Sequence, residues 1–195
     1  MTAQHRFAHV VLVDARVLRP PGERPIPVVM AMRDLTTGAQ TIFTDADTPG
    51  AWSAYVGDDV LWITNDAEAL GAYLRGRDAP CPRHVLDLGV EARAAWNGLA
   101  PSAHDDTVVA MLRFGIQRAP LHDPVEICEL LTRRHLTASE VRRVAGQAQL
   151  RLDIQGELRE ALRTNGISLP HALLRGRYFM ALAEMGRRGL PVDVV

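Results

Sequence analysis

The chain has 195 residues, of which 47% are hydrophobic and 23% are charged, and its formal net charge at pH 7 is −1. This composition is that of an ordinary globular protein, which argues against wholesale disorder, and the length allows one domain with an appendage. All 22 basic residues are arginine, so the lack of lysine excludes Schiff-base chemistry and a Walker-type phosphate lysine.

Neither a membrane span nor a disulfide framework is indicated. No apolar run approaches the roughly 18 residues of a transmembrane helix, and the first nine residues lack the apolar centre of a signal peptide. We therefore expect a cytoplasmic protein without membrane contact. Cys81 and Cys128 lie far apart and without CxxC spacing, which argues against a structural zinc site.

The first predicted element is a strand at residues 9–16, because a Val-rich apolar run is bounded by polar positions and has no helical periodicity. Side chains alternate along a strand, so Asp14 and Arg16 project from one face and Ala15 from the other. The strand therefore presents a carboxylate with an arginine beside it.

Two further strands are predicted at residues 27–33 and 39–44. A loop with three prolines and a glycine precedes them at 19–25, and a turn at 34–38 separates them. Connections this short predict an antiparallel meander.

The pattern then changes. A compact apolar strand at residues 60–64 is followed at once by a helix at 66–75, a fifth strand is predicted at 85–88, and only helices follow. This order predicts an α/β, ribonuclease-H-like fold, in which a mixed five-stranded sheet of a meander and then parallel strands is flanked by helices.

The helices after the fifth strand have clear start and stop signals. One begins at the Asp-Pro pair at 123–124, and the next begins at Thr137, which has capping-box spacing to Glu140. That second helix is expected to end at the Asn-Gly pair at 165–166, and a last helix covers about 168–188.

Five segments together resemble the 3′–5′ exonuclease domain of family A DNA polymerases. They are residues 11–14 with the loop that follows, 30–38, 65–71, 85–91 and 175–193. The last is similar to the segment that leaves the exonuclease domain and enters the polymerase thumb. The resemblance implies an exonuclease-like domain at 1–166, a helical extension at 167–195 and a role in DNA replication or repair.

The resemblance also implies a site of four acids that hold two divalent metal ions, which clamp the attacking water and the leaving oxygen. The family pattern is Asp-x-Glu on the first strand, an acid four residues after an Asn that follows the fourth strand, and a final Asp. A Tyr or His four residues before the final Asp positions the water.

Two of the four acids are present. Asp14 matches the first acid and Asp153 the last, but Arg16 replaces the Glu. Gln149 stands where the Tyr or His is expected.

Counted from Asn65, the remaining acid position holds Ala69. Glu68 is displaced from that position by one residue, or about 100° around a helix.

A guanidinium supplies only hydrogen-bond donors, so it cannot ligate Mg²⁺ and repels it at close range. We therefore expect a catalytically degenerate module without a resident metal cofactor. The hypothesis that follows is that Arg16 pairs with Asp14 and fills the vacated metal position.

Two alternatives remain open. One is an active, Mg²⁺- or Mn²⁺-dependent 3′–5′ exonuclease whose metal ligands are Asp14, Glu68 and Asp153, with a contribution from Asp87 or Asp106. The other is a pure protein-interaction domain.

Other polar clusters have structural explanations. Asp87 and Glu91 occupy positions that usually cap and solvate a helix. The His-Asp-Asp cluster at 104–106 is a possible metal-ligand group, but its two acids are also typical of a helix N-terminus. The same applies to His122 beside Asp123.

Positive charge gathers in the second part of the chain, because residues 118–195 contain 12 arginines and 9 acids. Predicted nucleic-acid contacts are Asn65, Arg142, Arg143 and Arg151. Such binding would use phosphate contacts with single-stranded DNA or a primer-template end and would weaken with salt.

The arginines have a structural alternative as well, which is a solvated helix surface with ion pairs such as Glu140 to Arg143. The expected protein partner is a separately encoded polymerase or replication protein that binds residues 167–195.

Overall fold

The computed structural model describes residues 7–44, 47, 52, 54–95, 124–164 and 166–188. The elements in chain order are β1 (His9–Leu18), β2 (Ile26–Asp34), β3 (Gln40–Thr44), β4 (Val60–Thr64), α1 (Ala67–Gly76), β5 (His84–Asp87), α2 (Leu88–Ala95), α4 (Pro124–Leu131), α5 (Ala138–Thr164) and α6 (Leu169–Arg188). The predicted cluster at 104–106, with His122 and Asp123, lies outside the described residues.

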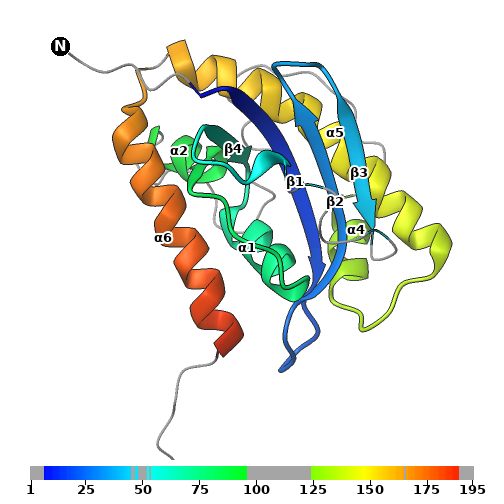
Figure 1. Ribbon diagram of the computed structural model, residues 1–195. Coiled ribbons are helices and arrows are strands. Elements are labelled where there is room, and N and C mark those ends of the chain that lie inside the picture. Colours follow the sequence, from blue (N-terminus) through cyan, green and yellow to red (C-terminus); the bar gives the residue numbers. More distant parts are fainter. Residues whose placement is uncertain are drawn as a thin grey trace, which may run out of the picture.

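The strands form one five-stranded sheet in the order β3-β2-β1-β4-β5, with β1 at its centre (Figure 1). β1 pairs antiparallel with β2 and parallel with β4, and β4 pairs parallel with β5. The predicted meander followed by parallel strands is therefore confirmed.

Helices cover both faces of the sheet (Figure 1). On one face α1 buries Leu70 and Tyr73 against β1 and β4, and on the other α5 buries a stripe that includes Leu152 and Leu158. Because both faces are covered, the parallel strand β4 is buried at every position. None of the helices in the described ranges is long and apolar enough to cross a membrane.

The predicted capping box opens α5. The Thr137 backbone N–H donates to Glu140 Oε2 at 2.8 Å, and the Glu140 N–H donates to Thr137 Oγ1 at 3.3 Å. At the other end of α5, Gly166 has a φ of +76°, a left-handed conformation that favours glycine.

Asp87 joins the end of β5 to two helices. Its Oδ2 accepts the Ala67 N–H at the start of α1 at 2.8 Å, and its Oδ1 accepts the Val90 N–H of α2 at 3.0 Å. The capping role expected for Asp87 is confirmed. Burial raises its pKa to about 6, although the two backbone N–H groups act in the opposite direction.

α6 lies outside α1 and against β5 (Figure 1). A methyl group added at Gly176 would overlap the Val85 carbonyl oxygen, and one at Gly71 would lie 2.7 Å from Ala183 Cβ. Both glycines therefore allow α6 to approach its neighbours closely.

Gly176→Ala should lower the free energy of unfolding by about 1–3 kcal/mol, since α6 must move away from a backbone carbonyl. Gly186→Ala in the same helix meets no atom within 4 Å and should instead raise stability, by up to about 1 kcal/mol. Denaturant unfolding of both variants tests this, and equal effects would contradict the close packing of α6.

As the pH rises from about 4 to 6, the free energy of unfolding should fall because of Asp87. Over that range the unfolded carboxyl, with a pKa of 3.8, ionises while the folded one still holds its proton. The loss should approach about 2–3 kcal/mol at 1.36 kcal/mol per pKa unit. Urea unfolding at several pH values should show that Asp87→Asn lacks this loss, and an unchanged pH dependence would refute the assignment.

Candidate functional site

The Asp14 carboxylate is bound by two guanidinium groups. Arg16 donates from Nε to Asp14 Oδ2 at 2.6 Å, and Arg151 of α5 donates from Nε to Oδ1 at 3.1 Å. Asp14 is only 4% exposed, and the side chains of Arg16 and Arg151 are 14% and 8% exposed. The predicted pair of Asp14 with Arg16 is confirmed, and a second arginine joins it.

Strand and helix periodicity together assemble this group. Asp14 and Arg16 project from the face of β1 that α5 covers, while Val13 points to the α1 side. α5 presents a buried polar row, one residue per turn, alongside its apolar stripe: Gln147, Arg151 and Gln155. Gln155 donates to the Val13 carbonyl oxygen at 3.2 Å, which fixes the helix on the strand.

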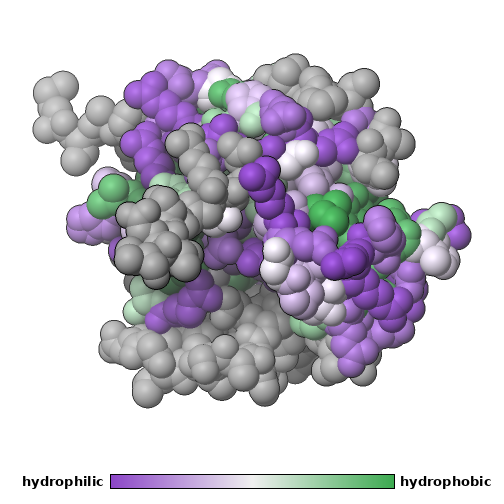
Figure 2. All heavy atoms as spheres, turned by 90° about the horizontal axis from the view of Figure 1, so that it is seen from below, coloured by the Kyte–Doolittle hydropathy of each residue, from purple (hydrophilic) through white to green (hydrophobic). Residues whose placement is uncertain are grey.

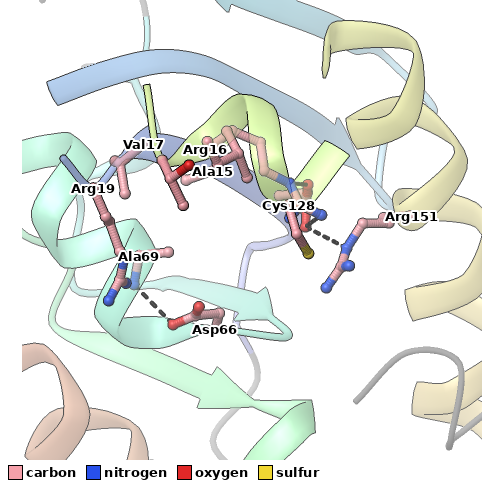
Figure 3. A pocket seen from close by; sticks show the side chains of 11 residues that line it. Ala15, Arg16, Val17, Arg19, Asp66, Ala69, Cys128 and Arg151 are labelled. Carbon is pink, nitrogen blue, oxygen red and sulfur yellow. Dashed lines mark hydrogen bonds and ion pairs between the residues drawn. The ribbon is translucent and has the colours of Figure 1, made fainter. Parts of the chain in front are cut away.

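Asp14, Arg16 and Arg151 border a pocket of about 210 Å³ between the end of β1 and helices α1, α4 and α5 (Figure 3). Arg19 and Asp66 lie across the pocket from Arg151 (Figure 3). The full lining is Asp14, Ala15, Arg16, Val17, Arg19, Asp66, Ala69, Cys128, Leu131, Thr132 and Arg151.

Figure 2 views the molecule from the side at which β1 ends, and the described surface there is mostly hydrophilic, with a smaller hydrophobic area. Cys128 of α4 belongs to the pocket lining, and both it and Cys81 are free thiols.

The pocket does not fit the pair of metal ions that the fold implies. Its lining brings three guanidiniums and two carboxylates together, and both oxygens of Asp14 already accept bonds from arginine. A guanidinium has no lone pair to give to a metal. In the part of the chain that the structure describes, no group of three or more His, Cys, Asp or Glu side chains could hold a metal ion.

Ala69 lines the pocket at the place where the sequence pattern expects an acid, so a methyl group replaces a ligand there. The neighbouring Glu68 is instead paired with Arg19, whose Nη1 lies 2.9 Å from its Oε1. Glu68 is not among the lining residues.

Asp153 is placed differently from the prediction. Its carboxylate pairs with Arg33 Nη2 of β2 at 2.7 Å, while Arg151 is the α5 residue that contacts Asp14. Two residues along a helix are about 200° apart, so the two side chains leave α5 in nearly opposite directions. The α5 position that contacts Asp14 is therefore 151, two residues before Asp153, and the residue one turn before Arg151 is the buried Gln147.

The predicted nucleic-acid contacts do not form one surface. Asn65 is buried, and Arg151 is buried against Asp14. Arg143 pairs with Glu126 of α4 in place of the expected Glu140, and Arg142 is exposed on α5. Glu140 pairs with Arg133.

Glu91 was expected to be a solvated helix residue, and this expectation was wrong. It is 3% exposed and receives two bonds from Arg175 of α6, at 2.7 and 2.5 Å. The hydrogen bonds that Arg175 donates to the Glu91 carboxylate raise the pKa of Arg175. This bidentate pair ties α2 to α6.

Removing the charge of Asp14 should be costly, because two largely buried guanidiniums lose their shared partner. Asp14→Asn should lower the free energy of unfolding by about 3 kcal/mol or more. Asp153→Asn removes a half-exposed ion pair and should cost about 1 kcal/mol or less. Chemical denaturation of the two variants measures the difference, and a similar loss in both would contradict the role of Asp14.

Comparisons with known proteins give a structural match only. No family model matches the chain, and no curated protein matches it. Among solved structures, Brucella melitensis NrnC with bound Mg²⁺ superposes with a TM-score of 0.62 and 13% identity over 97% of this chain and 91% of NrnC.

Two further structures give similar values. Escherichia coli RNase D, an exoribonuclease involved in structured RNA processing, has a TM-score of 0.60 and 13% identity over 90% of this chain. The catalytic core of Trypanosoma brucei RRP6 has a TM-score of 0.58 and 12% identity over 88%. The chain spans 45% of the RNase D chain and 46% of the RRP6 chain.

These structures give no support to the polymerase-specific part of the resemblance. Identities of this size show a shared fold and not a shared activity. The chain therefore has the mixed five-stranded, ribonuclease-H-like fold of DEDD 3′–5′ exonucleases such as RNase D, NrnC and RRP6.

Proposed function

We propose that this chain is a catalytically degenerate exonuclease-like module, which binds single-stranded nucleic acid during DNA replication or repair without cutting it. One observation carries the proposal: Arg16 and Arg151 are bound to Asp14, where an active site of this fold would collect carboxylates around metal ions. Guanidinium groups therefore stand where carboxylates would bind metal ions.

The electrostatic cost of a metal ion here is large. Two unit charges 4 Å apart interact by about 4 kcal/mol at an effective dielectric constant of 20, so a divalent ion is repelled by about 8 kcal/mol for each nearby guanidinium. One carboxylate shared between two arginines offers little compensation. The active-nuclease alternative also needs Glu68 and Asp153, and each of these is paired with an arginine on another element.

Binding of nucleic acid is supported by the same charges and by the fold. The arginines that oppose a metal ion attract phosphate, and Arg142 adds an exposed positive charge on α5. One solved structure with this fold is NrnC bound to pGG. For this chain we propose the binding of a nucleic acid but not its hydrolysis.

The test measures binding and cleavage on the same labelled single strands of DNA and RNA. Anisotropy should show binding that weakens steeply as salt rises, because phosphate contacts release counterions. Gel analysis with Mg²⁺ or Mn²⁺ should show no shortening. Metal-dependent shortening that Asp14→Ala abolishes would overturn the proposal, and lack of binding at low salt would favour the protein-interaction alternative.

A rebuilt variant provides the matched positive control. Arg16→Glu, Ala69→Asp and Arg151→Asp together return three acids to the pocket beside Asp14. This variant should bind Mn²⁺ in calorimetry where the wild type does not. Equal Mn²⁺ binding by both proteins would contradict the claim that the arginines exclude the metal.

A further inference from the structure

Among the described residues that line the pocket at the end of β1, three are arginines and two are aspartates. Arg16 and Arg151 share the single carboxylate of Asp14. The other carboxylate of the lining, Asp66, is the N-cap of α1 and accepts the Ala69 N–H at 2.8 Å, where the helix dipole offsets its charge.

The third arginine, Arg19, is balanced from outside the pocket, because its partner Glu68 is not part of the lining. Each guanidinium carries five N–H donors in a planar fork. The bonds to Asp14 use Nε and Nη2 of Arg16, and the bond to Glu68 uses Nη1 of Arg19. Donors of both side chains therefore remain for a ligand.

Space and burial suit a phosphate group. The pocket volume of about 210 Å³ has room for several water molecules, each of which takes ~30 Å³ in the liquid. Asp14 holds the side chains of Arg16 and Arg151 nearly buried. Both guanidiniums are therefore oriented and partly desolvated before a ligand binds. A planar guanidinium fork matches the oxygens of a phosphate group.

We infer that this pocket binds the terminal phosphomonoester of a single-stranded nucleic acid, with Arg16 and Arg19 as its donors. The guanidiniums then act as the fixed counter-charge that metal ions supply in a catalytic site of this fold. This inference rests on the proposed function and names the group that it recognises.

A terminal phosphate is favoured over an internal one by its charge. A monoester carries a charge of about −1.5 to −2 at pH 7, because its second pKa is about 6, whereas an internal diester carries only one negative charge.

The experiment uses the full chain in EDTA and single strands that differ only at one end. Anisotropy titrations compare a 3′-phosphate with a 3′-hydroxyl and, separately, a 5′-phosphate with a 5′-hydroxyl, so the two sources of the phosphomonoester are distinguished. At least one phosphorylated end should bind about tenfold tighter, and inorganic phosphate should remove only that increment.

Arg19→Gln is the main test variant, because the side chain is 46% exposed and its loss should leave the fold intact. It should lose most of the tenfold preference, and Arg16→Gln should lose it as well if its thermal unfolding remains cooperative. Arg142→Gln is the matched control on exposed α5 surface, and it should weaken binding of both ends equally.

The outcomes separate this inference from the proposed function. Equal binding of phosphorylated and hydroxyl ends overturns the pocket assignment but leaves nucleic-acid binding standing. If no strand binds but inorganic phosphate raises the melting temperature of the wild type and not of Arg19→Gln, the anion site stands and its nucleic-acid ligand is overturned. If neither strands nor phosphate bind, both proposals are overturned.

Discussion

The shared carboxylate of Asp14 is the interaction on which the arrangement of this protein depends. It lies on the central strand and binds one arginine from its own strand and one from α5, so a single buried acid fixes the longest helix to the middle of the sheet. Because all three groups are largely desolvated, loss of Asp14 would leave two buried guanidiniums without their shared partner, and this should cost more than breaking a surface ion pair.

The same contact changes what the site can do. A two-metal nuclease needs a concave cluster of oxygen ligands, and the corresponding pocket here presents nitrogen donors. Under the proposed function, the pocket accepts an anion without a change of fold. The fold and the chemistry of the site therefore separate in this chain.

Within the described ranges, the acids that could have rebuilt a metal site are committed elsewhere in the molecule. Asp87 caps helices at the end of β5, and Glu91 holds α6 through Arg175. Glu68 and Asp153 pair with Arg19 and Arg33. Each of these contacts joins a helix to another part of the fold, so the carboxylates serve the packing of the helices.

The sequence by itself determined the strands, their order along the chain, the ends of α5 and the pairing of Asp14 with Arg16, because each rests on local periodicity or on residues a few positions apart. It did not determine which polar side chain beside the apolar stripe of α5 reaches Asp14. The packing of α5 on the sheet placed Arg151 against Asp14 and Asp153 against Arg33. A polar row at 147, 151 and 155 beside the apolar stripe was the available signal.

Only the tertiary structure decided that Glu91 is buried and that Arg19 is drawn to Glu68. These contacts join residues 84 and 49 positions apart, and no local pattern constrains such a pairing. The physical reason is general: alternation and capping act within a few residues, whereas the partner of a buried charge depends on how complete elements pack.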